Sequence, residues 1–315
     1  MSTTQGDLSS STAMINSEDK PDHLLVLVHG IMGSPNDWTY CEAELKRRLG
    51  KKFLVHVSSC NMYTKTFTGI DGAGRRLADE VLEVVKKEDS LKMISFLAHS
   101  FSGLIARYAI AVLYTPNVFS NFPDDTCYKL RNLISLKRCQ LFLTDEEADK
   151  PPLLLRMASD CDEGKFLFAL AAFRCRVLYA NVSYDHMISN FDTGSLQMGH
   201  WMATNTSVLS ESPNFPSEAA EAKEAAQNYP STQNTVEYHE IMEDEMIRGL
   251  QRLGWMKVDV SFHSIFWPFF AHFNIQGKNE RFHNAGAGVV AHVADTIKQQ
   301  NSSPCISVSR CILAR

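Results

Sequence analysis

The chain has 315 residues, of which 44% are hydrophobic and 21% are charged, a composition typical of a globular protein with a large core. The formal net charge at pH 7 is −5, which leaves no excess of basic groups to neutralise phosphates and argues against nucleic-acid binding. The eight cysteines include no CxxC pair, which argues against a zinc ribbon and a disulfide framework. We therefore expect reduced thiols, a cytoplasmic location, no metal site and no cofactor.

The sequence predicts no membrane anchor. Residues 1–20 are polar and rich in serine and threonine, which predicts a disordered tail rather than a secretory signal. The longest strongly apolar stretch, 265–273, is far shorter than the roughly 20 residues that a spanning helix needs. We expect no transmembrane segment, and peripheral contact with a membrane stays open.

Apolar runs alternate with segments of helical periodicity in the first third of the chain. The run LLVLV at 24–28 is typical of a strand that is buried on both faces, and Ser34-Pro35-Asn36-Asp37 is typical of a helix start. Further strands are predicted at 53–58 and 93–98, and helices at 34–49, 74–87 and 101–113. This alternation predicts an α/β fold with a mostly parallel sheet and helices on both faces.

The remainder of the chain is less regular. Residues 115–149 are predicted to be irregular, and the polar residues 190–230 are predicted to form a lid-like excursion. The other predicted elements are a helix at 162–173, a strand at 176–182, a helix at 237–253, a strand at 257–262 and a helix at 285–299. We place one domain at 21–295 and a disordered tail at 296–315.

The segment Ala98-His99-Ser100-Phe101-Ser102-Gly103 lies between a predicted strand and a predicted helix, which is where a nucleophile elbow belongs. An elbow holds its serine in a strained conformation, so the residues two before and two after the serine must be small. Ala98 and Ser102 meet this requirement. The pattern predicts Ser100 as a nucleophile, although such a short match also occurs by chance.

A serine nucleophile needs donors for the developing oxyanion. We expect one from the amide of Phe101 and a second from Ile31 or Met32, in the turn that follows His29-Gly30. His29 and His99 are expected to shape their turns rather than to act as bases.

In this fold the acid and the histidine follow the serine along the chain. Asp185 comes just after the strand at 176–182 and is predicted as the acid, the alternative being a helix cap. His272 is predicted as the base because a loop of its length past the last strand can return over Ser100. His263 and His283 are the alternatives, and His263 or His272 could instead pack among nearby aromatic rings. His239 has acidic neighbours and is predicted to be solvated, with no metal-ligand spacing.

The chain resembles the DUF676-type serine esterases, lipase-like α/β-hydrolases, in the form found in plants. The matching segments, in chain order, are LLVLVHGIMGSPNDW, FLAHSFSGLIARYAIAVLY, FLTDEEADKPPLLLRM, RVLYANVSYDHM and VDVSFHSIFWPFFAH. The resemblance implies an α/β-hydrolase fold, activity on acyl esters, and Ser100, Asp185 and His272 at the triad positions.

Two departures from the family pattern stand out. The family has Leu-Gly-Gly after the nucleophile, where this chain has Phe101-Ser102-Gly103. We expect Ser102 to crowd the elbow or to bond Ser100 or His99, so that its change to glycine would raise turnover. The family also has a further strand ending in Thr-Pro-His-Leu-Gly after the elbow helix, which we do not recognise between Tyr114 and Leu141. Residues 133–136 (LISL) are the candidate to fill the resulting gap in the sheet.

Together these features predict a serine hydrolase that cleaves carboxylic esters, with an acyl ester or lipid as substrate. Two alternatives are a catalytically impaired protein that binds without turnover and an acyltransferase that uses the same triad.

Overall fold

The computed structural model describes residues 20–114, 150–161, 164–181, 236–260, 271–278, 286–301 and 310–314, and the single positions 140, 141, 143, 145 and 262. The irregular segment and the lid-like excursion predicted from the sequence lie almost wholly outside these residues, as does the predicted N-terminal tail.

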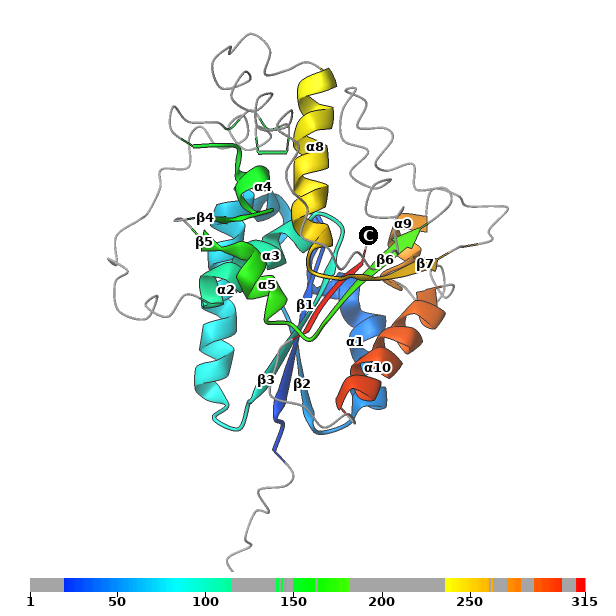
Figure 1. Cartoon of the computed structure of the whole chain (residues 1–315). Coiled ribbons are helices and arrows are strands. Elements are labelled where there is room, and N and C mark those ends of the chain that lie inside the picture. The colour runs from blue at the N-terminus through cyan, green and yellow to red at the C-terminus, as the bar shows by residue number, and fades with distance from the viewer. Residues whose placement is uncertain are drawn as a thin grey trace, which may run out of the picture.

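A six-stranded sheet forms the centre of the molecule, with strand order β2-β1-β3-β8-β6-β7 and every neighbouring pair parallel (Figure 1). The strands are β1 (His23–Val28), β2 (Phe53–Val57), β3 (Met93–His99), β6 (Cys175–Asn181), β7 (Met256–Val260) and β8 (Arg310–Ala314). Because the strands are parallel, their carboxyl ends meet at one edge, where loops can gather side chains for chemistry. The predicted α/β fold is confirmed.

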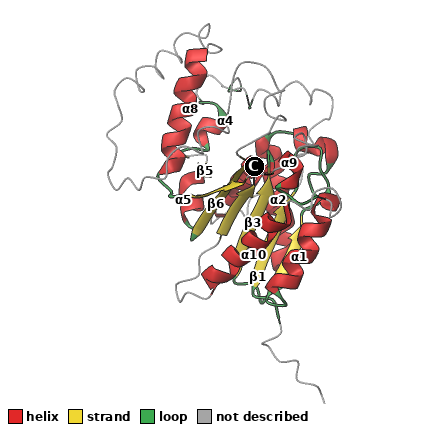
Figure 2. Ribbon diagram, turned by 90° about the vertical axis from the view of Figure 1, so that its right-hand side faces the viewer, coloured by secondary structure: helices red, strands yellow, loops and turns green. Residues whose placement is uncertain are grey.

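Helices cover both faces of the sheet. Helices α1 (Thr39–Leu49) and α10 (Ala287–Asn301) lie on one face, toward the viewer in Figure 2. The other face packs against α2 (Ile70–Lys87), α3 (Ser102–Tyr114), α4 (Leu153–Arg156), α5 (Phe166–Ala171) and α8 (Val236–Gln251). The short elements are the 3-10 helices η2 (Pro35–Trp38) and η3 (Tyr63–Phe67), the hairpin β4 (Asp160–Cys161) with β5 (Gly164–Lys165), and α9 (Ala271–Asn274).

The position of β1, covered on both faces, explains why its sequence is uniformly apolar. Leu24, Val26 and Val28 point into the core on the α2–α3 side, and the alternate residues Leu25 and Leu27 point into the core on the α1–α10 side. Each of these side chains is at most 1% exposed. A strand that is covered on both faces has no polar face, so an unbroken apolar run is the expected pattern.

Strand β8 lies between β3 and β6 in the middle of the sheet, and its red arrow is visible there in Figure 1. Its residues pair with both neighbours, from Arg310 opposite Ser95 to Ala314 opposite His99. The disordered tail predicted at 296–315 is therefore corrected, since 296–301 complete α10 and 310–314 form this strand. Residues 133–136, the sequence candidate for this place, lie outside the described part of the chain.

The helix predicted at 162–173 is also shorter than expected. The chain first forms the β4–β5 hairpin, and α5 begins only at Phe166. Asp160 Oδ1 accepts hydrogen bonds from Leu167 N–H at 2.9 Å and from Phe168 N–H at 3.1 Å. This carboxylate caps the helix from outside its own turn, a contact that helical periodicity does not reveal.

Candidate active site

Ser100 lies at the turn between β3 and α3 and has a φ angle of 57°. This left-handed conformation is uncommon for a residue with a side chain and costs roughly 1–3 kcal/mol unless the surroundings enforce it. The next turn begins at once, because Gly103 N–H donates to Ser100 O and Leu104 N–H donates to Phe101 O, both at 3.0 Å. The strain and the strand-to-helix position are those that a nucleophile elbow requires.

The small residues around Ser100 allow the strand and the helix to approach each other. Ala98 is fully buried, and Ser102 is 1% exposed. The Ser102 hydroxyl donates a hydrogen bond to His29 O at the end of β1. The structure thus differs from the expectation that this hydroxyl would bond Ser100 or His99. The Ser102 hydroxyl instead ties α3 to the end of the neighbouring strand β1.

The turn after β1 lies directly beside Ser100. A Cβ atom on Gly30 would lie 3.0 Å from His99 Nδ1 and 3.6 Å from Ser100 Cβ, so the backbone comes closer here than a side chain would permit. Gly33 N–H donates to Gly30 O at 3.0 Å and closes the turn. The segment that was predicted to supply an oxyanion donor is therefore adjacent to the predicted nucleophile.

The three candidate oxyanion donors differ in their partners. Met32, which has a φ angle of 55°, donates its N–H to Thr66 Oγ1 at 3.1 Å. Within the described part of the chain, the amides of Ile31 and Phe101 have no hydrogen-bond partner. Ile31 and Phe101 are thus free to donate, and Met32 is engaged. Sequence reasoning gave no role to Thr66, which lies 34 residues beyond Met32 and carries no local signal.

The two predicted turn-shaping histidines are both buried. His29 is 1% exposed, with Nδ1 lying 3.1 Å from Gly30 O, and His99 is 2% exposed. An added Cβ atom on Gly33 would lie 3.0 Å from His29 Nδ1, so this ring packs against the turn. Their burial against the two turns agrees with a structural role.

An apolar rim, defined here as the exposed side chains of Ile31, Met32, Tyr63 and Phe67, lies on the turn after β1 and on helix η3. Helix η3 supplies Tyr63 and Phe67 and is tied to the turn, because Tyr63 N–H donates to Gly33 O at 2.9 Å. The same helix supplies the hydroxyl that holds Met32. The turn beside Ser100 and the helix tied to it therefore present apolar side chains to solvent.

The remaining triad candidates are only partly described. Strand β6 ends at Asn181, four positions before Asp185, and Asp185 itself lies outside the described residues, as do His263 and His283. His272 is the second residue of α9, whose backbone follows β7 and precedes a buried segment at 274–277. The assignment of the acid and the base stays a prediction.

His239 corrects an expectation, since it is 6% exposed rather than solvated. Helix α8 turns Tyr238, Met242 and Met246 into the core, and His239 lies at the edge of this apolar stripe. Burial lowers the pKa of the His239 imidazole.

In the described parts of the chain, no group of three or more His, Cys, Asp or Glu side chains is placed to hold a metal ion. Among the same residues, no helix is long and apolar enough to cross a membrane.

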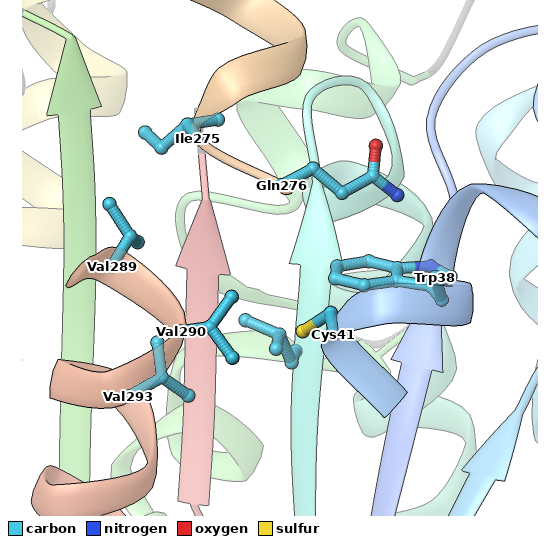
Figure 3. Close-up of a pocket in the computed structure, with 8 residues that line it drawn as sticks. Trp38, Cys41, Ile275, Gln276, Val289, Val290 and Val293 are labelled. Atoms are coloured by element: carbon cyan, nitrogen blue, oxygen red, sulfur yellow. The ribbon is translucent and has the colours of Figure 1, made fainter. Parts of the chain in front are cut away.

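A cavity of about 10 Å³ lies on the face of the sheet that α1 and α10 cover, between these two helices and the segment after α9 (Figure 3). Its lining includes Trp38, Cys41, Gln276 and Val290 but not Ser100. Trp38 Nε1 and Gln276 Nε2 are buried there without a hydrogen-bond partner among the described residues. Such a volume holds about one water molecule, so this cavity is not the substrate site.

Comparisons with known proteins identify the family of the chain. A family model described as "Putative serine esterase (DUF676)" matches residues 18–137 and 125–196, which together make up more than half of the chain. "Putative lipase ROG1" from Saccharomyces cerevisiae (strain ATCC 204508 / S288c) is 30% identical over 112 residues. That match covers 34% of this chain and only 16% of the yeast protein. With its parallel sheet covered by helices on both faces, the chain belongs to the DUF676 family of serine esterases, which has an α/β-hydrolase-like fold.

Proposed function

We propose that the chain is a serine hydrolase that cleaves carboxylic esters, with Ser100 as nucleophile, His272 as base and Asp185 as the acid that orients the base. The observation that carries this proposal is the left-handed φ angle of Ser100 at a strand-to-helix turn, next to the amides of Ile31 and Phe101, which have no partner among the described residues. A structural serine has no need of such strain, whereas a nucleophile must be held clear of its own helix.

In the proposed reaction the Ser100 hydroxyl oxygen attacks the ester carbonyl carbon while its proton passes to His272. The carbonyl oxygen becomes an oxyanion that the amides of Phe101 and Ile31 stabilise. Collapse of this intermediate breaks the ester C–O bond, and the histidine returns the proton to the departing alkoxide. A water molecule then attacks the acyl-enzyme by the same route, releasing the carboxylic acid and free Ser100.

The apolar rim supports an ester with an apolar acyl chain as substrate. Ile31 and Met32 are exposed on the turn beside Ser100, and Tyr63 and Phe67 are exposed on the 3-10 helix tied to that turn. Burial of their surface against an acyl chain would contribute roughly 25 cal/mol per Å² to binding. Water-soluble esters of short acids would leave this surface unused.

Labelling with a fluorophosphonate probe tests the proposal, because the probe reacts only with an activated serine. We expect rapid labelling of the wild type and a loss of roughly 10³-fold or more in Ser100→Ala. Ser90→Ala is the matched control, since the Ser90 hydroxyl donates to Pro21 O at the opposite end of the sheet. Folded wild type that is not labelled would instead favour a protein that binds without catalysis.

A further inference from the structure

Lys278 and Asp37 join two segments that the proposed reaction uses. Lys278 Nζ lies 2.9 Å from Asp37 Oδ1, although 241 positions of sequence separate the two residues. The Asp37 side chain is 12% exposed and that of Lys278 is 39% exposed, so the carboxylate is largely withdrawn from water. An ion pair with one buried member is screened less than a pair on the open surface.

On the lysine side, the pair acts on the segment that carries His272. The Lys278 ammonium lies 5.1 Å from the centroid of the Phe273 ring, within the range of a cation–π interaction. Phe273 directly follows His272 in α9, which is only four residues long. A single helical turn is not stable by itself, so its placement depends on contacts such as this one.

On the aspartate side, the pair acts on the turn that carries Ile31. Asp37 Oδ2 accepts a hydrogen bond from Ser34 N–H at 3.1 Å. An added Cβ atom on Gly33 would lie 2.7 Å from the same oxygen, so the carboxylate is pressed against the turn. One carboxylate therefore uses its two oxygens for two different segments.

The chain between these contacts is anchored by packing. Ile275 and Gln276 are each 2% exposed and face the cavity shared with Trp38 and Val290 (Figure 3). Gly277 has a φ angle of 64°, and an added Cβ there would lie 3.3 Å from the Tyr40 ring. The buried residues fix the middle of the segment, and Lys278 reaches back from its end to Phe273.

We infer that Asp37 and Lys278 are positioning residues that hold the His272 segment in fixed relation to the turn after β1. This inference rests on the proposed function, because it matters for catalysis only if His272 serves Ser100. Among the described residues, the contacts of the pair are with Ser34, Phe273 and each other, so we assign it no direct part in the reaction. Their effect is to keep the base and the oxyanion donor in register, and a misplacement of about 1 Å in such a site can cost roughly 10²-fold in rate.

The test compares Lys278→Met, Lys278→Arg and Asp37→Asn with the wild type, and uses Lys46→Met as matched control. Lys46 pairs with Glu42 at 2.6 Å on the exposed side of α1, so the control removes a similar charge away from the site. The first readout is the first-order rate constant of fluorophosphonate labelling at saturating probe, measured separately from the half-saturating probe concentration. The second is amide hydrogen exchange over 271–278 and 30–34.

We expect Lys278→Met and Asp37→Asn to slow the labelling step by roughly tenfold, with little change in the half-saturating concentration. Lys278→Arg keeps the charge and should stay within about threefold of the wild type, and Lys46→Met should match it. Amide exchange should speed up at both segments in Lys278→Met and Asp37→Asn, but not in Lys278→Arg or Lys46→Met. A structural role alone would lower the melting temperature without separating the arginine and methionine variants in the labelling step.

The outcomes separate the two proposals. If Lys278→Met leaves both labelling and exchange unchanged while Ser100 still reacts, the positioning role is refuted and the proposed function stands. If exchange increases but the labelling step does not slow, the pair is only structural and the positioning role is again refuted. If the folded wild type is not labelled at Ser100, the proposed function fails, and the exchange measurement still decides if the ion pair holds the two segments.

Discussion

Replacing Ile312 by proline tests the place of β8 in the sheet. Ile312 is the central residue of this strand and lies opposite Leu97 of β3 on one side and Val177 of β6 on the other. Proline has no N–H to donate and its ring disturbs the neighbouring strand, so it is poorly tolerated in an interior strand. The substitution therefore acts at a position that has neighbours on both sides.

The expected magnitude follows from the lost hydrogen bond. A backbone hydrogen bond contributes about 1 kcal/mol, and the acceptor that is left unpaired costs roughly 1–3 kcal/mol more. The free energy of unfolding should thus fall by about 2–4 kcal/mol. For a domain of this size, each 1 kcal/mol shifts the melting temperature by roughly 2–4 °C, so we expect a decrease of about 4–16 °C.

The assay pairs thermal unfolding with fluorophosphonate labelling. Because β8 ends opposite His99, directly before Ser100, loss of the strand should also slow labelling. Ile312→Val is the conservative control and should change neither quantity substantially. An Ile312→Pro variant that unfolds at the wild-type temperature would refute the reasoning.

Three further predictions follow from individual contacts in the structure. Gly30→Ala should slow labelling by roughly tenfold, because its Cβ would lie 3.0 Å from His99 Nδ1, whereas Gly288→Ala, which meets no atom within 4 Å, should not. Ser102→Gly removes the hydroxyl that donates to His29 O, so we expect a melting temperature below that of the wild type and no gain in ester turnover, contrary to the expectation from the sequence. Burial raises the pKa of Glu80, but hydrogen bonds from His56, Ser58 and Ser59 outweigh it and lower the pKa to about 2. The carboxylate therefore stabilises the fold fully above its usual pKa of 4.5 and loses this effect as the pH falls toward 2. We expect Glu80→Gln to lower the free energy of unfolding at pH 7 by about 2 kcal/mol. In denaturant titrations the difference from the wild type should shrink below pH 4.5.

The parts of the fold that the sequence predicts are those that short segments specify. The run at 24–28 shows its two-sided burial in five residues, and the elbow around Ser100 is specified by small residues between a strand and a helix. Asp37 was also recognised, as the acid at a helix start, and it does accept a hydrogen bond from Ser34 N–H. In each case the residues that carry the sequence signal lie within a few positions of each other.

The features that were missed depend on partners far apart in the chain. The four apolar residues CILA at 311–314 are too few to distinguish a central strand from a tail. They are recognised as a strand only because they pair with both β3 and β6. His239 was assigned to solvent because of its acidic neighbours, although the stripe of Tyr238, Met242 and Met246 turns that side of α8 inward. No local pattern indicates that Lys278 pairs with Asp37.

The strained conformation of Ser100 links these non-local contacts to the proposed chemistry. A left-handed serine costs roughly 1–3 kcal/mol and persists only where its neighbours leave no relaxed alternative. Here the end of β3 is held by β1 on one side and β8 on the other, and α3 is tied to β1 through Ser102 and His29. The elbow can therefore persist only if a strand also pairs with the other edge of β3. The C-terminal strand meets this condition, so we expect the stability of the sheet and the reactivity of Ser100 to decrease together when β8 is disturbed.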